Sequence, residues 1–492
     1  MTKEFDKQCF FKMLGIVLLF TLFLFPYNYC SDIYNVMDVG YIEYAKEWFA
    51  PAGRTVGMCV LYLFDVMKIP IDMYICIMKI LAIFIAAYTI YTFYNMVLDA
   101  IQNKEEIDSS KKKYIFIATI ITFLNMATYQ YFYYAESAVM LMGVMLTVLA
   151  VKMIIKDNNR LKYLKAFVFL FIAMNCYQST ILFFMPATLL FLGIKKDKLI
   201  KIIGEIIKLS LLVGICLLLG YYILQSLTEY FEIIPYRENI IAINKETVVM
   251  ILRYLIFQNH DEFGYNFTYL IINVFLIVFT LILKKKFIKK KKLVAVSIII
   301  FIIMSAFLQT WGIVSAVNYY FADRIQFAYL STVGLCALFF VMYTDILDYK
   351  IIKKMAYIFL IIFLIYMIGK ANYLSILNRY VRMRDNLEGK AIAEAIERYE
   401  EFNEYEITQI LYCFDNELKY NCIDVEPHGE PTFRILGSPW VLGSALKYYV
   451  GYDIETAYCQ GAFTEIFDDR EWDWFDERQM KFEENVLYLS IY

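Results

Sequence analysis

The stretch FLIVFTLILKKKFIKKKKLVAVSIIIFIIMSAF, residues 275–307, places seven lysines between two long apolar runs. An apolar run of about 20 residues is long enough to cross the roughly 30 Å core of a bilayer. Clustered lysine marks the cytoplasmic end of such a span. The stretch therefore predicts two membrane-spanning helices joined on the cytoplasmic side.

The same pattern extends over most of the chain. Eleven apolar runs are candidates for spans: 10–27, 71–97, 114–133, 137–154, 164–179, 180–194, 202–224, 266–284, 293–311, 326–345 and 355–371. Lysine gathers in every second loop, at 111–113, 152–165, 195–201, 284–292 and 350–354. The opposite loops, near 28–54, 129–136, 228–262 and 312–325, carry Tyr, Asn and acids instead. This alternation places the N-terminus in the cytoplasm and everything after residue 371 outside.

Composition agrees with a membrane protein. The chain has 492 residues, of which 61% are apolar and 18% aromatic, and its mean hydropathy is +0.53. Soluble domains are nearer 45–50% apolar. With 47 basic and 49 acidic residues, the chain lacks the basic excess of a nucleic-acid-binding protein, and we expect no nucleic-acid partner.

Two short segments do not fit the count of spans. TVGMCVLYLFDVMKI (55–69) contains an acid, and treating it as a crossing would reverse every later loop. DVGYIEYAKEWFA (38–50) reads as a short helix with aromatic residues on one side. We expect both to lie in the outer interface. The expected membrane domain is therefore 1–371, all-α, with interfacial helices in the outer loop 28–69.

The tail from 372 to 492 has a different character, with more charge and shorter apolar runs. Residues 388–403 read as a helix, and 408–414 and 485–492 read as strands. We expect a small α/β extracytoplasmic domain.

Cysteine and histidine set limits on chemistry. Cys413 and Cys422 flank a plausible turn and are candidates for a disulfide in an oxidising exterior, with an unpaired structural Cys as the equal alternative. The only histidines are His260 and His428, and no CxxC pair occurs. A zinc site and a Ser-His-Asp or Cys-His enzyme are not expected.

Polar residues of the predicted outer loops are the candidates for function. Asp32 and Asp38 follow the first span, and Arg54 closes the same loop. A carboxylate there is placed to accept a proton from a hydroxyl nucleophile, and an arginine to bind a phosphate. The alternative is that both acids are helix caps or solvated loop residues.

Further candidates lie at other outer ends. Glu136 sits in YQYFYYAES (129–137) among aromatic residues that suit sugar faces, although an aromatic belt is common at any membrane boundary. Tyr177 and Gln178 begin YQST and are candidates for substrate binding. The alternative is that the polar groups of YQST only hydrogen-bond backbone groups left free at a turn. The remaining cations of the predicted outer loops are Arg253, His260, Arg324 and Arg379. They are candidates to bind a phosphate, and the alternative is that they form ion pairs with neighbouring acids.

A family resemblance rests on these motifs. SDIYNVMDVGYIEYAKEWFAPAGR (31–54) resembles the first outer loop of the GtrII-like bacterial glucosyltransferases, in which a paired acid and an arginine precede an aromatic helix and a Gly-Arg pair. Here Asp32 and Gly53-Arg54 match, whereas Ser31 and Asn35 depart from the pattern. YQS (177–179), GSPW (437–440) and EWDWFDERQM (471–480) are also similar to family segments.

The resemblance implies a fold and a reaction. Such enzymes have a C-type glycosyltransferase fold in the bacterial plasma membrane. They transfer a sugar, usually glucose, from a polyprenyl-phosphate carrier to a cell-surface glycan or wall polymer, with inversion. No nucleotide and no cofactor would be required, and a divalent metal between Asp32 and Glu136 is an open alternative.

The implied roles are then specific. Asp32 would be the general base, with Asp38 and Glu136 as alternatives. Arg54, and next Arg324, would steady the charge of the phosphate leaving group. A lipid-linked sugar flippase and a polysaccharide polymerase or ligase are the rival functions; the absence of an evident internal repeat and the large tail weigh against a transporter.

Overall fold

The computed structural model describes residues 5–24, 30–102, 107–156, 161–195, 198–233, 292–316, 322–344, 349–415, 430–459, 461–472 and 475–491. The described chain is mostly helical, with a small sheet near the C-terminus. It divides into two compact units. The first holds the described residues of 5–24 and 45–372, and the second those of 30–44 and 373–491.

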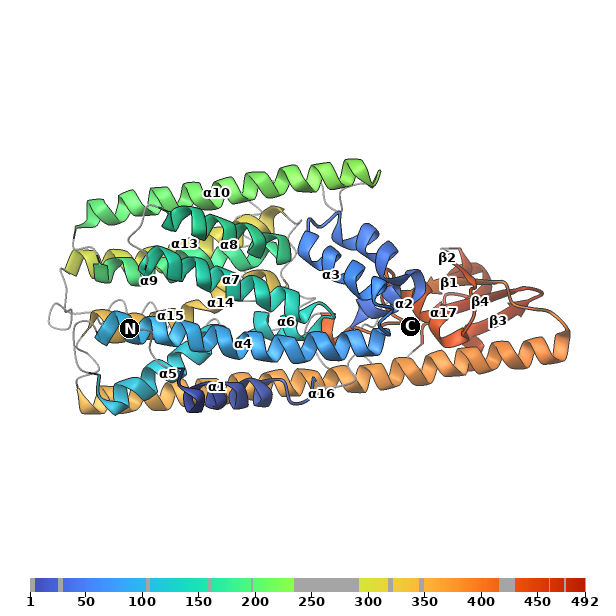
Figure 1. The fold of residues 1–492 in the computed structure, drawn as a ribbon. Coiled ribbons are helices and arrows are strands. Elements are labelled where there is room, and N and C mark those ends of the chain that lie inside the picture. Colours follow the sequence, from blue (N-terminus) through green and yellow to red (C-terminus); the bar gives the residue numbers. More distant parts are fainter. Residues whose placement is uncertain are drawn as a thin grey trace. The chain divides into compact units, whose positions relative to one another are not determined.

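Helices that lie side by side make up the first unit (Figure 1). Its α-helices are α1 (Lys7–Phe20), α3 (Thr55–Val66), α4 (Ile71–Gln102), α5 (Ser109–Phe123), α6 (Met126–Tyr133), α7 (Ser137–Lys156), α8 (Lys162–Cys176), α9 (Phe184–Lys195), α10 (Leu199–Tyr230), α13 (Lys292–Ala316), α14 (Phe327–Leu330) and α15 (Thr332–Tyr343). Short π- or 3₁₀-helical turns add η1 (Ala45–Phe49), η2 (Gln178–Phe183) and η4 (Asp323–Gln326). The first half of α16 (Lys350–Asn403) completes the unit.

Several of these helices can cross a membrane. Among the described residues, five are long and apolar enough, or six if the bent pair α5–α6 counts as one. Each predicted apolar run within the described ranges contains helix, although the first run, 10–27, is helical only as far as Phe20. The run 266–284 lies outside the described residues. The expected short helix at 55–69 is α3, with 12 residues. Membrane-spanning character is thus supported, while the number of crossings stays a prediction.

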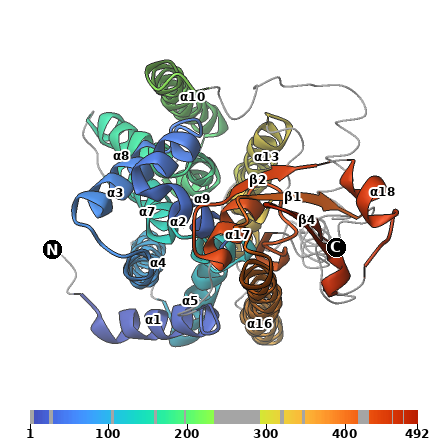
Figure 2. The same cartoon turned by 90° about the vertical axis from the view of Figure 1, so that its right-hand side faces the viewer.

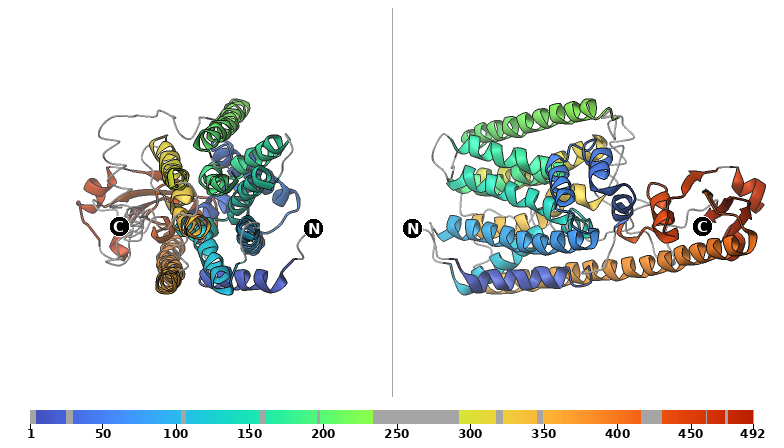
Figure 3. Two further views of the ribbon diagram at one scale, coloured as in Figure 1. Left: turned by 90° about the vertical axis from the view of Figure 1, so that its left-hand side faces the viewer. Right: turned by 45° about the vertical axis from the view of Figure 1, so that its right-hand side comes forward.

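The outer surface of α10 shows why the unit needs lipid. The views in Figures 1 and 3 place this helix along one edge of the first unit's bundle. Leu211, Leu218 and Tyr222 are each more than 60% exposed on it. A row of large apolar side chains facing outward is costly in water and normal in a bilayer.

The α5–α6 bend positions much of the site described below. The two helices meet at an angle of 54°. Asn125 causes the break: its backbone is extended and its side chain accepts a hydrogen bond from the Thr128 N–H at 3.2 Å, which starts α6 anew. The following residues, 126–133, are all buried.

A four-stranded sheet forms the core of the second unit, in the order β2-β1-β4-β3 (Figure 2). Its strands are β1 (Gln409–Phe414), β2 (Glu455–Tyr458), β3 (Met480–Glu483) and β4 (Val486–Ile491). β1 runs parallel to β2 and β4, and β3 is antiparallel to β4. The second half of α16, α17 (Leu442–Val450) and the short α18 (Ala462–Phe467) accompany the sheet. The strands predicted at 408–414 and 485–492 are confirmed.

Two predicted helices begin earlier than expected. The helix predicted over 388–403 is confirmed, but it is the last part of α16, which has no break after residue 371. The helix expected over 38–50 begins earlier, as α2 (Ser31–Tyr44), and breaks at Gly40, where φ is 81°. Its residues 30–44 belong to the second unit and η1 to the first.

Candidate functional site

Arg54 is the centre of a polar and aromatic set in the first unit. Its guanidinium lies 4.9 Å from the ring centroid of Tyr177 and 5.7 Å from that of Phe49. Its Nη1 donates to Oε1 of Glu136 at 3.2 Å. Within the described part of the chain, the buried Nε of Arg54 has no hydrogen-bond partner. The side chain as a whole keeps 22% of its surface exposed.

Glu136 is nearly buried, with 4% of its side chain exposed. Its carbonyl accepts the N–H groups of Val139 and Met140, so the residue stands at the N-terminus of α7. The partial positive charge of a helix N-terminus favours a carboxylate there, and Arg54 neutralises the remaining charge. Glu136 is therefore an anchor for the arginine.

A tight turn after η1 carries Arg54 into this position. Gly53 has a φ of +65°, which glycine adopts without strain, and its N–H bonds to the carbonyl of Ala50 at 3.0 Å. A Cβ on Gly53 would lie 3.3 Å from Nε2 of Gln178. That amide donates to the carbonyl of Ala52. Gln178 thus fastens the turn to the start of η2.

The next helix ties the turn to α8 as well. Oγ1 of Thr55, the first residue of α3, donates to Oδ1 of Asn175 at 2.7 Å. The amide of Asn175 in turn donates to the Phe171 carbonyl at 2.8 Å. Both sides of Arg54 are therefore held by the C-terminal end of α8 and the residues that follow it.

A second arginine has the same kind of setting. The guanidinium of Arg324, in η4, lies 4.5 Å from the ring centroid of Tyr134 and donates to the Tyr134 hydroxyl. Its backbone N–H donates to Oε1 of Gln130 at 2.9 Å. Its carbonyl accepts from the hydroxyls of Tyr131 at 2.8 Å and Ser179 at 3.1 Å.

Tyr131 and Tyr177 connect the two arginines into one set. The two rings stand edge to face with centroids 5.6 Å apart. Tyr131 bonds to Arg324, and Tyr177 lies beneath Arg54. Of the ten residues that the sequence nominates for the site, the structure brings five into this set: Arg54, Glu136, Tyr177, Gln178 and Arg324.

Five nominated residues are not part of this set. Arg379 lies in α16, in the second unit. Asp32 lies in the first turn of α2, in the second unit. Asp38, also in α2, accepts from Oγ of Ser444 at 2.9 Å and from Nζ of Lys447 at 3.3 Å. Arg253 and His260 lie outside the described residues, as does Cys422.

The Asp38 contacts favour the protonated form of one partner. Lys447 also pairs with Asp453 at 3.0 Å. The carboxylates of Asp453 and Asp38 raise the pKa of Lys447 above its ordinary value. Lys447 therefore stays positively charged at neutral pH, and with Ser444 it engages both oxygens of Asp38.

Sequence reasoning did not single out Phe49 beside Arg54, nor Gln130, Tyr131 and Tyr134 beside Arg324. The last three stand within the quoted segment YQYFYYAES, but nothing in those letters shows which side chains turn toward Arg324. Their selection depends on the bend at Asn125 and on η4.

The arrangement offers fixed positive charge in a mainly aromatic setting. Two arginines held on tyrosine rings are suited to an oxyanion, because guanidinium donors match phosphate geometry. Among the described residues, no three His, Cys, Asp or Glu side chains are grouped to hold a metal ion. Comparisons with protein-family models, curated proteins and solved structures found no match to this chain.

Proposed function

We propose that the chain is an integral-membrane glycosyltransferase that moves a sugar from a polyprenyl-phosphate carrier to a cell-surface glycan or wall polymer. The sequence motifs suggest this class of donor, and the membrane-spanning helices give a lipid-linked substrate direct access from the bilayer. The polar set around Arg54 and Arg324 carries the proposal, because it supplies the charge that a departing lipid phosphate requires.

The arginines are the proposed phosphate ligands. As the glycosidic bond breaks, the phosphate oxygen gains the bonding electron pair, and donors placed in advance stabilise that charge at little reorganisation cost. Arg54 is held by Glu136 and by the Tyr177 ring. Arg324 is held by Tyr134. These supports keep both guanidiniums in place in the absence of a ligand.

Tyr177, a candidate for substrate binding, is assigned a supporting role instead. Its side chain is buried, with 4% of the residue exposed, so its ring is covered and does not present a face for stacking on a sugar. We assign it to Arg54, as a platform. Glu136 likewise serves Arg54 instead of acting as a base, since its charge is already paired.

The proposed reaction is a single displacement at the anomeric carbon. The acceptor hydroxyl oxygen forms the new bond to that carbon while the bond to the phosphate oxygen breaks, which inverts the configuration. The hydroxyl proton passes to a carboxylate, and the lipid phosphate leaves with the electron pair. Asp32 remains the proposed base on the strength of the sequence motif alone.

The test is sugar transfer by purified full-length protein in detergent. Radiolabelled polyprenyl-phosphate-glucose is supplied with cell-wall polymer fractions, and wild type is compared with Asp32→Asn. Loss of a general base costs about 10²–10⁴-fold in rate, so we expect label to reach polymer with wild type and to fall at least about a hundredfold with the variant.

The control is Asp468→Asn, which alters an exposed acid of the second unit. It should transfer like wild type. Equal activity of wild type and Asp32→Asn would keep the enzyme but remove Asp32 as its base. No transfer from any lipid-phosphate sugar would reject the proposed function.

A further inference from the structure

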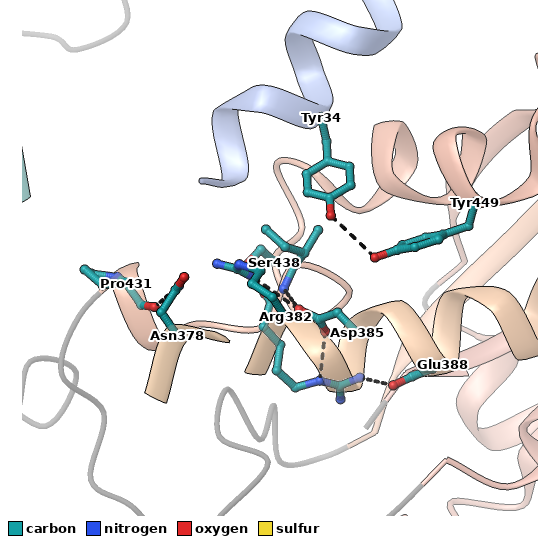
Figure 4. Close-up of polar contacts among 10 residues, drawn as sticks. Tyr34, Asn378, Arg382, Asp385, Glu388, Pro431, Ser438 and Tyr449 are labelled. Atoms are coloured by element: carbon teal, nitrogen blue, oxygen red, sulfur yellow. Dashed lines mark hydrogen bonds and ion pairs between the residues drawn. The ribbon is translucent and has the colours of Figure 1, made fainter. Parts of the chain in front are cut away.

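Helix α2 is built into the second unit through Tyr34. This side chain is 5% exposed and belongs to the same apolar core as Ile392 of α16 and Leu446 of α17. Its ring meets Tyr448 edge to face at 5.3 Å between centroids. Its hydroxyl lies 3.4 Å from that of Tyr449 (Figure 4). A residue of the first outer loop thus forms part of the tail's core.

Polar contacts add to this attachment of α2. Asp38 bonds to Ser444 and Lys447 of α17. The amide of Asn35 reaches the carbonyl of Trp440 at 3.5 Å. Tyr34 and Asp38 stand four residues apart and therefore lie one above the other on the helix. Asp32 precedes Tyr34 by two residues, which puts it roughly 160° around the axis from it.

A buried ionic network joins α16 to the segment that precedes α17. Arg434 is fully buried and pairs with Asp385, at 3.5 Å, and with Glu388 of α16. Asp385 also accepts from the N–H of Ile435 at 2.7 Å and pairs with Arg382 at 3.1 Å (Figure 4). Buried charges keep such partners because separating them leaves an uncompensated charge.

We infer that the second unit is a positioning device for Asp32. It holds α2 through Tyr34, Asn35 and Asp38, which fixes the rotation of the helix about its axis and therefore the direction in which Asp32 leaves it. Tyr34 and Asp38 are then positioning residues, and the tail contributes to catalysis without touching the substrate. This inference rests on the proposed function, because it gives Asp32 the role of base.

The decisive comparison is kinetic, with Tyr34→Ala and Tyr34→Phe in the full-length protein. A displacement of about 1 Å in a catalytic group can cost about a hundredfold in rate. We expect Tyr34→Ala to lower kcat by about that factor while KM for the lipid-linked donor stays within about twofold, since the proposed phosphate ligands lie in the other unit. Tyr34→Phe keeps the ring packing and should restore kcat to near wild type.

Tyr458→Ala is the matched control, because Tyr458 is an exposed tyrosine of the same unit, 54% exposed on β2. Its kcat should match wild type. Unchanged kcat in Tyr34→Ala would overturn the inference, and so would an equal loss in Tyr458→Ala or a loss confined to donor KM. Failure of wild type to transfer any lipid-linked sugar would instead reject the proposed function, and this positioning role with it.

A cross-link keeps the attachment itself testable if Tyr34→Ala does not fold. The double variant Asp38→Cys with Ser444→Cys is oxidised in membranes, and mass spectrometry is used to find a disulfide-linked peptide joining the two positions. The pair should form and transfer should persist. Asp38→Cys with Glu401→Cys, which uses an exposed residue of α16, should not form it. Absence of the 38–444 link, or its formation with complete loss of transfer, would contradict the inference.

Discussion

Arg54 owes its orientation to three kinds of support at the scale of single residues. Glu136 supplies charge, Tyr177 and Phe49 supply ring faces, and Gly53 supplies a backbone turn that other residues adopt only with strain. Cation–π contacts are worth about 0.5–2 kcal/mol each, comparable to a partly exposed ion pair. No one support dominates, and each has a separate consequence when removed.

Gly53→Ala should destabilise the turn. Placing a Cβ at a φ of +65° costs about 1–2 kcal/mol, and the new atom would also press on Gln178. We expect a lower apparent unfolding temperature in detergent. Gly204→Ala is the matched control: nothing lies within 4 Å of a Cβ there, and alanine in the interior of α10 should be neutral or stabilising by up to about 1 kcal/mol. Equal behaviour of the two variants would show that the turn does not require glycine.

Glu136→Gln should weaken the donor site without abolishing the chemistry. Removing one partner of a fully buried pair costs about 3–5 kcal/mol. Because Arg54 is partly exposed, solvent screening reduces the loss, and about 1–2 kcal/mol is expected. Arg54 is proposed both to bind the donor phosphate and to stabilise the charge that the phosphate gains as the bond breaks, so the loosened arginine should raise KM for the lipid-linked donor and lower kcat. Unchanged kcat and KM would contradict the role of Glu136 as the anchor of Arg54.

Residue types and their approximate place were predictable for this site, but their pairing was not. The sequence marks Arg54, Glu136, Tyr177, Gln178 and Arg324 as polar groups at span ends, and the structure joins them. It does not show that Glu136 pairs with Arg54, because the two are 82 residues apart and meet only through helix packing. Asp38 was a candidate base because the sequence did not reveal its partners. These partners, on α17, lie about 400 residues away in the chain.

At the scale of elements, α16 shows how buried polar residues obscure a helix. Leu374, Asn378, Val381, Asp385 and Glu388 are all buried and follow a spacing of three and four residues. Only two of the five are apolar, so the apolar period fades after residue 371 although the helix continues. The predicted break reflected this mixed stripe. The Gly40 break in α2 was equally hidden, since a single glycine does not show where a helix ends.

The ionic network on this stripe gives an element-scale prediction. Arg434→Met should destabilise the second unit by about 3–5 kcal/mol, because Asp385 and Glu388 stay buried without it. Arg398, also on α16, forms an exposed ion pair with Glu477. Arg398→Met removes this pair and should change the free energy of unfolding by less than about 1 kcal/mol. Thermal unfolding followed by intrinsic fluorescence compares the two. Similar midpoints would mean that the network contributes little.

At the scale of the whole molecule, the membrane character was largely predictable because apolar length and lysine distribution are properties of the sequence itself. Each predicted run within the described ranges contains helix. The direction in which each helix crosses is a separate question, because it is defined relative to the membrane and not by the packing of the chain. Orientation therefore remains a prediction from lysine distribution.

Reporter fusions test that orientation. Alkaline phosphatase, which is active only outside the cytoplasm, should be inactive when fused after Tyr349 and active when fused after Ile491. The reason is that the lysine-rich start of α16 should stay inside while the helix crosses. The reverse pattern, or equal activity of both fusions, would contradict the predicted topology and the outer location of the tail.

Binding of polyprenyl phosphate to the purified protein tests the central claim most directly. The proteins to compare are wild type, Arg54→Ala, Arg324→Ala and Arg398→Ala. Polyprenol, which lacks the phosphate, is the control ligand. Charge-assisted hydrogen bonds are worth about 1.5–3 kcal/mol, so each of the first two variants should bind the phosphate roughly ten- to a hundredfold more weakly. Arg398→Ala should bind like wild type, and polyprenol should bind all four proteins alike. Equal affinity of wild type, Arg54→Ala and Arg324→Ala for the phosphate would contradict the account.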